Sequence, residues 1–322
     1  GASGTAVLGA ILVTGAFARI TVPEALGQLK ATVAELWRPI VLILLVLAFV
    51  AVFLLTEAWP ALQPGAELVS ADSFFQYVWP LMAGTVMVSI IALLIATPVA
   101  IGVALFISHY APPRIAQSVG FVIDLLAAIP SVVYGVWGWL TLAPLMVPIY
   151  GWLNENLGFI PFFGGSATTT GRTLLTSGVV LAVMVLPIIT ALCREIFTQT
   201  PKLHEEAALG LGATRWEMIK MTVFPFARAG IVSSIMLGLG RALGETMAVT
   251  FVIGNAFKWS GSLFSPGNSI ASALANEFNE AGGIQKSALL ELGLILFLIT
   301  TIVLALAKML LVRLSANEGK KT

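Results

Sequence analysis

Two charged side chains, Arg241 and Glu245, lie within an otherwise apolar run from Ile231 to Ile253. A guanidinium presents a planar fork of N–H donors that suits oxyanions, and a nearby carboxylate weakens such a site. An arginine at the bilayer centre costs about 2.5–3.5 kcal/mol on insertion scales, so it must face the bundle interior, a partner chain or a watery cavity. If the run is one helix, Glu245 lies one turn after Arg241 on the same face. The pair therefore indicates either an intramembrane ion pair or a site on the path of an anion.

The composition is that of an integral membrane protein. Of the 322 residues, 58% are hydrophobic and 10% are charged, whereas a soluble domain carries roughly 25% charged residues. The net charge of +1 gives no sign of a nucleic-acid partner. A single cysteine, Cys193, excludes an internal disulfide framework and a CxxC metal site, and His109 and His204 are far apart in sequence. We therefore expect no metal and no cofactor in this chain.

Six segments are apolar over the length of about 20 residues that a spanning helix needs. They are approximately 39–56, 79–108, 117–147, 174–197, 228–254 and 288–312. Placing both termini in the cytoplasm leaves three basic residues outside, Arg172, Lys258 and Lys286, with most others inside, as the positive-inside rule requires. The sequence thus predicts an all-α polytopic protein with six transmembrane helices and both termini cytoplasmic. Its predicted parts are an N-terminal segment (1–38), a membrane domain (39–315) and a tail (316–322).

The loop between the fourth and fifth spans reads TPKLHEEAALGLGATRWEMIKMTVFPFAR, residues 200–228. We expect a short helix, a turn at Gly212, and a second helix opened by a Thr-x-x-Glu capping box at 214–217. Trp216 falls on the apolar face of this second helix, and Pro225 is expected to end it before the fifth span. This pattern predicts a helical hairpin that docks against another protein. The alternative is a membrane-surface helix without a partner.

The same loop resembles the EAA signature of ABC importer permeases, in which Glu-Ala-Ala is followed by a glycine and an Ile-x-Leu-Pro ending. In this chain Thr222 and Phe224 replace the usual Ile and Leu. The resemblance implies that the loop is a coupling helix seated in a groove of a cytoplasmic ATPase. The residues that carry this role are Glu206, Ala207, Ala208, Gly212, Trp216 and Pro225.

Two further stretches, AAIPSVVYGVWG (127–138) and GRALGETMAVTFVIGN (240–255), resemble the permeases of phosphate-specific ABC importers, the PstC type more than the PstA type. The resemblance covers most of 75–312 and implies a type I importer permease fold in the bacterial inner (plasma) membrane. It also implies three kinds of partner: a second, PstA-type permease, two copies of an ATPase that binds ATP and Mg, and an external phosphate-binding protein. Residues 1–38 are not explained by it.

On this resemblance, Arg241 is expected to guide phosphate across, while Glu245 sets its rotamer or keeps the site from binding too tightly. The alternative is structural, with Arg241 neutralised by Glu245 or by Asp124, which we otherwise place near an inner gate. Gly240, Gly244 and Ala248 recur every four residues, a spacing that predicts close approach of another helix.

Ser131, Tyr134 and Thr246 are further candidates for the substrate path. Pro130 lacks a backbone N–H, bends its helix and leaves a carbonyl without its usual donor, so a hydroxyl beside it is placed to line a path. The alternative for Ser131 is a hydrogen bond back to its own helix.

The chain is not expected to be an enzyme, because it lacks a GxxxxGK[ST] phosphate-binding loop and a readable Ser/His/Asp set. Two other functions stay open: an ABC permease for another solute, such as sulfate, molybdate or an amino acid, and a stand-alone secondary transporter or channel. The EAA loop would have no role in the latter.

Overall fold

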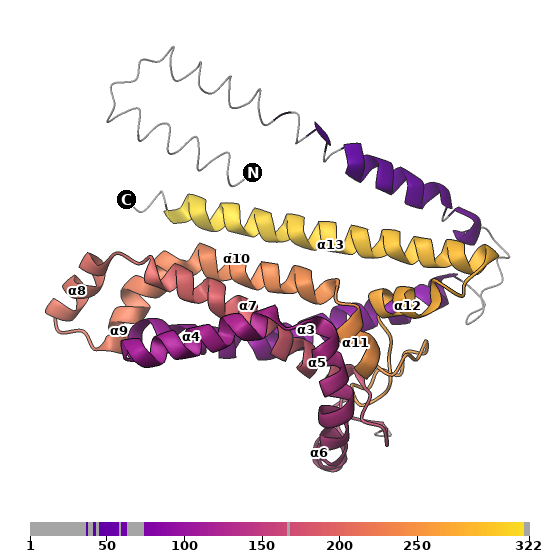
Figure 1. Cartoon of the computed structure of the whole chain (residues 1–322), viewed down its shortest axis with the longest axis horizontal. Coiled ribbons are helices and arrows are strands. Elements are labelled where there is room, and N and C mark those ends of the chain that lie inside the picture. Colours follow the sequence, from indigo (N-terminus) through magenta and orange to yellow (C-terminus); the bar gives the residue numbers. More distant parts are fainter. Residues whose placement is uncertain are drawn as a thin grey trace. The chain divides into compact units, whose positions relative to one another are not determined.

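The computed structural model of the chain is all-α throughout the residues that it describes (Figure 1). These are residues 37, 41–42, 45–57, 59–62, 74–165 and 168–318, with side chains described up to residue 309. The chain divides into two units, Gly1–Thr56 and Glu57–Thr322. The predicted segment 1–38 lies outside the described residues apart from Trp37. Within the first predicted span, 39–56, the structure describes an apolar helix at Leu45–Glu57.

Five helical stretches in the described residues are long and apolar enough to cross a membrane. They are Phe74–Tyr110, Ser131–Leu157, Leu174–Thr198, Arg215–Leu243 and Gly283–Met309. They correspond to the second to sixth predicted spans, so the all-α polytopic fold is confirmed. The cytoplasmic placement of the termini stays a prediction. Two of the predicted spans, the third and the fifth, have the wrong limits.

The third predicted span, 117–147, is two separate helices and not one kinked helix. Helix α4 (Pro113–Ala128) ends before Ile129, and α5 (Ser131–Trp137) begins after Pro130. Ile129 is extended, with φ −66° and ψ 131°, because the residue before a proline is pushed out of the helical region. The membrane-spanning stretch is therefore α5, the π-turn η3 (Gly138–Leu142) and α6 (Ala143–Leu157). Figure 1 shows α5 and α6 leading away from α3, α7 and α10.

The fifth predicted span, 228–254, is also interrupted. Helix α10 (Phe224–Leu243) ends at Gly244, and a shorter helix, α11 (Met247–Val252), follows after a non-helical turn. At the other end the expected stop at Pro225 is wrong. Pro225 lies within one continuous helical stretch, just after the π-turn η4 (Ile219–Val223), and such local π adjustments let a helix tolerate the missing N–H.

The helical stretch continues upstream of Pro225 as α9 (Arg215–Met218) and the π-turn η4 (Ile219–Val223). One helical stretch thus runs from Arg215 to Leu243, where the turn at 244–246 begins.

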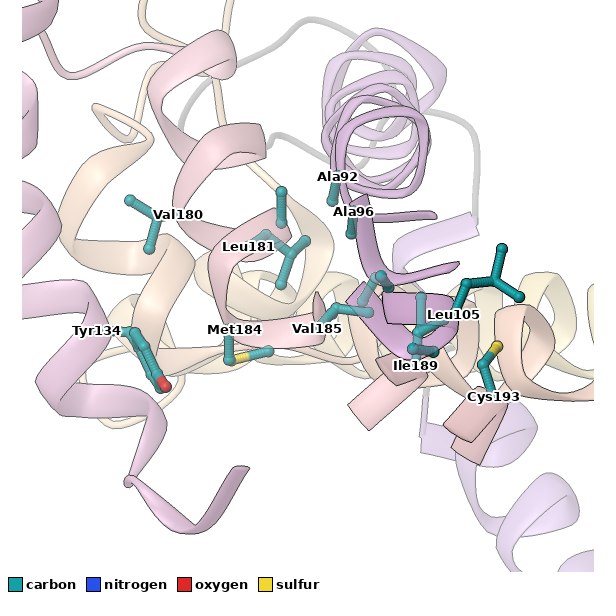
Figure 2. Close-up of a cluster of buried hydrophobic side chains, with 14 of the residues drawn as sticks. Ala92, Ala96, Leu105, Tyr134, Val180, Leu181, Met184, Val185, Ile189 and Cys193 are labelled. Atoms are coloured by element: carbon teal, nitrogen blue, oxygen red, sulfur yellow. The ribbon is translucent and has the colours of Figure 1, made fainter. Parts of the chain in front are cut away.

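Helix α7 (Leu174–Thr198) lies at the centre and packs against α3 (Phe74–Leu105), α4, α10 and α11. Helix α3 presents an alanine at every fourth position, and all four are fully buried: Ala92, Ala96, Ala100 and Ala104. In a membrane, close van der Waals packing of small residues holds helices together, because lipid is as apolar as the side chains. Figure 2 shows Ala92 and Ala96 in one cluster with Leu181, Val185 and Ile189 of α7.

A second buried cluster joins the start of α3 to α12 (Ile270–Glu277) and to the start of α13 (Gly283–Glu318). The Ser269 hydroxyl caps α12 by accepting a hydrogen bond from the N–H of Ser272. The Gln285 amide donates to the carboxylate of Glu277 at 3.1 Å. Figure 1 shows α13 continuing from this cluster alongside α10, which it contacts.

The close contact between α5 and α11 depends on a glycine. A Cβ at Gly135 would lie 2.9 Å from Cα of Ala248 and 2.8 Å from Cδ2 of Phe251. Real Cβ atoms do not approach backbone so closely, so only glycine allows this crossing. The IPSVVYG stretch is thus partly a packing motif.

We expect Gly135→Val to destabilise the membrane domain by about 1–3 kcal/mol, because an added side chain forces the backbones of α5 and α11 apart. The measurement is the midpoint of thermal unfolding of the purified chain in detergent. Gly151→Val is the matched control in the same spanning stretch, since a Cβ there would meet no atom of the described residues within 4 Å. An unchanged midpoint for Gly135→Val would show that α5 and α11 do not pack in this way.

Candidate functional site

Two breaks in helical continuity, at 129–130 and 244–246, lie at the same end of one packed helix pair, α5 and α11. Gly135 of α5 lies against Ala248 of α11, and one turn on, a Cβ at Gly138 would lie 3.0 Å from the side chain of Val252. The two short helices therefore run parallel, and the turns that precede them, 129–130 and 244–246, lie close to each other. Irregular backbone at membrane depth is tolerated only where it is buried in protein or lines a watery cavity.

Tyr134 satisfies the backbone at the first turn. Its hydroxyl donates a hydrogen bond to the carbonyl oxygen of Leu126 at 2.8 Å. Leu126 precedes Pro130 by four residues, so in an unbroken helix it would be the acceptor for an N–H that proline lacks. The Tyr134 side chain is buried, with 7% of its surface exposed. Tyr134 therefore fixes α5 against α4, a role that its place in the sequence does not show.

Arg241 lies in the last turn of α10, beside the second turn, and its side chain is exposed. Neither proposed ion pair is present: among the described residues, no carboxylate lies within 4.0 Å of its guanidinium, and Asp124 lies exposed on α4. Arg241 and Tyr134 thus lie beside neighbouring turns, and among the described residues no carboxylate pairs with the guanidinium.

Glu245 and Thr246 form the turn itself. The Glu245 carboxylate accepts a hydrogen bond from the N–H of Ala248 at 3.2 Å, and the Thr246 hydroxyl donates to the carbonyl of Gly244 at 3.3 Å. Because α10 ends at Leu243, the expected one-turn helical relation between Arg241 and Glu245 does not hold. Glu245 instead satisfies one of the free N–H groups in the first turn of α11, that of Ala248.

The small residues at four-residue spacing, Gly240, Gly244 and Ala248, are separated by the turn at 244–246. A Cβ at Gly240 would lie 3.8 Å from Cδ2 of Leu304 in α13, whereas Gly244 has left the helix and Ala248 packs on α5. The three residues allow close contacts, but with different neighbours. Ser131, the remaining candidate, is half-buried at the first position of α5.

Arg241 also lines an open groove of about 450 Å³ between α10 and α13. The groove is lined by Ser233, Met236, Leu237, Gly240, Arg241, Leu304, Ala307 and Lys308. None of these residues is acidic. The pairing of α10 with α13, and therefore this groove, is not visible in the sequence.

The loop before α10 forms the expected helical hairpin. Helix α8 (Lys202–Gly210) leads to Gly212, whose φ of 88° is a conformation that favours glycine. The capping box is confirmed: Thr214 Oγ1 accepts from the N–H of Glu217 at 3.3 Å, and the Glu217 carboxylate accepts from the N–H of Thr214 at 2.8 Å.

The hairpin is fixed to the helices on one side and exposed on the other. Ala208 and Ile219 are buried, whereas Glu206, Ala207 and Gly212 are exposed. Large apolar side chains are exposed as well: Leu203 by 75%, Leu211 by 89% and Trp216 by 47%. Exposed apolar groups together on a short hairpin are typical of an interaction surface.

Two charged residues that sequence reasoning does not single out are buried or half-buried. The half-buried Arg172 approaches the carbonyl of Thr250 at 3.4 Å and lies 6.0 Å from the centre of the Trp139 ring. Glu291 of α13 is 8% exposed, and its Oε2 atom has no hydrogen-bond partner among the described residues. The signal for Glu291 is an acidic residue within a predicted span.

Comparison with known proteins shows the family. Residues 96–316 match the family model of the binding-protein-dependent transport system inner membrane component. The phosphate transport system permease protein PstC of Pasteurella multocida is 52% identical over 243 residues, or 74% of this chain and 76% of that protein. PstC of Haemophilus influenzae is 44% identical over 291 residues, which are 87% of this chain and 91% of that protein. The chain belongs to this family, among its PstC-type permeases.

A solved structure shows the same fold. A chain of the MetNI methionine ABC transporter, in an inward-facing conformation, superposes with a TM-score of 0.53 at 16% identity, covering 75% of this chain and 95% of that one. The type I importer permease fold and the inner-membrane location are thus confirmed. As a component of a binding-protein-dependent system, the permease is not a stand-alone transporter.

We expect Tyr134→Phe to lower the stability of the permease by about 0.5–1.5 kcal/mol, because it removes the hydroxyl hydrogen bond to the carbonyl of Leu126 and leaves the N–H of Ile129, at 3.3 Å, as its donor. Thermal unfolding in detergent measures the effect. Tyr110→Phe is the matched control, since the Tyr110 side chain is 43% exposed. Equal unfolding midpoints for the two variants would contradict the assigned role of Tyr134.

Proposed function

We propose that this chain is the permease subunit of an ATP-driven importer of inorganic phosphate and forms half of the translocation path. Phosphate is the substrate that the names of its PstC relatives give. The observation that carries the proposal is the exposed guanidinium of Arg241, which lies at a helix break and has no carboxylate within 4.0 Å among the described residues.

Arg241 provides the charge that a phosphate ion needs at membrane depth. Its N–H groups can bind two phosphate oxygens at once, which a point charge cannot do with the same geometry. Glu245 acts as a positioning residue. Its hydrogen bond with the N–H of Ala248 fixes the turn at 244–246, which directly follows the last turn of α10, where Arg241 lies. Tyr134 fixes the neighbouring turn at 129–130 through its hydrogen bond to Leu126. The two turns therefore keep a fixed position relative to the phosphate ion.

The exposed face of the hairpin at 202–218 is the proposed docking surface for the ATPase, with Leu203, Leu211 and Trp216 as its apolar contacts. Trp216 and Arg241 belong to the same helical stretch, Arg215–Leu243, and lie roughly 38 Å apart at 1.5 Å per residue. A displacement of the hairpin by the ATPase therefore moves the end of α10 that carries Arg241. This link supports alternating access driven by ATP hydrolysis in a partner subunit.

The complete importer in this proposal has three further subunits and an external component. A second, PstA-type permease completes the path, two ATPase copies bind ATP and Mg, and a phosphate-binding protein delivers the ion from outside. The exposed position of Arg241 supports the second permease, because a guanidinium at this depth is costly against lipid.

Arg241→Lys and Arg241→Gln are expected to lower phosphate uptake by about 10- to 100-fold, the effect of losing a hydrogen bond to a charged group. The measurement is uptake of radiolabelled phosphate by the complete importer in proteoliposomes, with sulfate, molybdate and arsenate as competitors. Arg228→Gln, an exposed arginine near the other end of α10, is the matched control. Normal uptake by either Arg241 variant would refute the role of Arg241, and stronger competition by sulfate or molybdate than by phosphate would refute the substrate.

Leu211→Asp is expected to weaken binding of the ATPase by at least about fivefold, because a charge replaces an exposed apolar anchor. Co-purification of the ATPase with the permease in detergent measures this binding. Phe159→Asp, at a residue 80% exposed in a different loop, is the control. Equal ATPase recovery with both variants would place the docking surface elsewhere.

A further inference from the structure

The groove between α10 and α13 has a direction. The two helices run antiparallel (Figure 1), with Gly240 beside Leu304. From there, falling residue numbers on α10 and rising numbers on α13 lead the same way, toward the coupling hairpin. Ser233 lies about 12 Å from Arg241 along α10, and Lys308 lies about 6 Å beyond Leu304 along α13. Arg241 is thus at one end of the groove, and Lys308 is at the other end with Ser233.

Among the described residues, no acidic side chain pairs with the two basic side chains of this groove. Lys308 is exposed, and among the described residues no carboxylate lies within 4.0 Å of its ammonium group. The remaining lining is apolar or small, and Leu237 and Leu304 are exposed by 58% and 47%. The guanidinium of Arg241 in this apolar groove is costly unless an anion or water accompanies it. Lys308, near the end of the apolar stretch Gly283–Met309, adds a second positive charge on the side of the coupling hairpin.

We propose that Lys308 is a second phosphate-binding residue, which receives the ion after Arg241 on its way toward the coupling-hairpin side. This inference rests on the proposed function. The groove volume of about 450 Å³ admits a phosphate ion with part of its water. An ammonium is a compact, strongly hydrated charge that lacks the planar fork of a guanidinium. Lys308 therefore attracts the ion without holding it in one geometry, which suits release.

The same chemistry would bind the phosphate group of an anionic lipid, because Met236, Leu237 and Leu304 could contact an acyl chain. Basic pockets between membrane helices are known lipid headgroup sites. The two sources differ in their dependence on membrane composition. Transported phosphate requires Lys308 in any bilayer, whereas a bound lipid requires Lys308 only when anionic lipid is present.

The test is phosphate uptake by the complete importer in proteoliposomes made with and without anionic lipid. We expect Lys308→Gln to lower the maximal uptake rate by about tenfold in both membranes, as loss of one charged contact does. We expect Lys308→Arg to keep most of the rate, because it keeps the charge. Lys286→Gln is the matched control on the same helix, where the ammonium lies 5.6 Å from the Phe278 ring and lines no groove with Arg241.

A charge-rescue experiment separates transport from structural support. Lys308→Cys is expected to lose uptake, to regain it with aminoethyl methanethiosulfonate, which restores a positive charge, and to stay inactive with the sulfonatoethyl reagent. The native Cys193 is buried, and the wild-type importer treated with the same reagents is the control.

Normal uptake by Lys308→Gln, or equal uptake after both reagents, would overturn the role of Lys308. A loss confined to membranes with anionic lipid would overturn it in favour of a lipid site. Failure of the wild-type importer to take up phosphate, or normal uptake by Arg241→Gln, would instead refute the proposed function.

Discussion

The constraint on which this structure depends is that every backbone polar group inside a bilayer must find a partner within the protein. Helical continuity is broken at the ends of two spanning stretches, at Ile129–Pro130 before Ser131–Leu157 and at Gly244–Thr246 after Arg215–Leu243. The hydroxyl of Tyr134 and the carboxylate of Glu245 then provide hydrogen bonds that an unbroken helix would make internally. Polar side chains at these positions are therefore part of the architecture, and the exposed Arg241 beside them is the group left for a ligand.

Close helix packing is what allows the two breaks to lie together. Alanines at every fourth position of α3 bring it against α7, and Gly135 brings α5 against α11. Both contacts depend on the absence of large side chains, because van der Waals contact is the main attraction between helices in lipid. The central α7 contacts both α5 and α11. The packed core therefore fixes the geometry of the turns that precede these two helices.

The site and the coupling hairpin are connected by covalent structure and by helix pairing. The helical stretch from Arg215 to Leu243 carries the hairpin at one end and Arg241 at the other. Helix α13 packs beside it and adds Lys308 to the same groove. A movement of the hairpin therefore changes the surroundings of both basic residues, which is what coupling between ATP hydrolysis and an anion path requires.

The sequence by itself determined the membrane class, the cores of the spans, the capping box at Thr214 and Glu217, and the family, because hydropathy and short motifs are local properties. It also located Arg241 as the charge that needs an explanation. The predicted one-turn spacing of Arg241 and Glu245 was wrong. That prediction assumed one unbroken helix, whereas α10 ends before Gly244. Only the tertiary structure decided that Tyr134 bonds to Leu126 and that Lys308 shares a groove with Arg241. Both depend on which helices lie side by side, and in an almost uniformly apolar chain no sequence period specifies that choice.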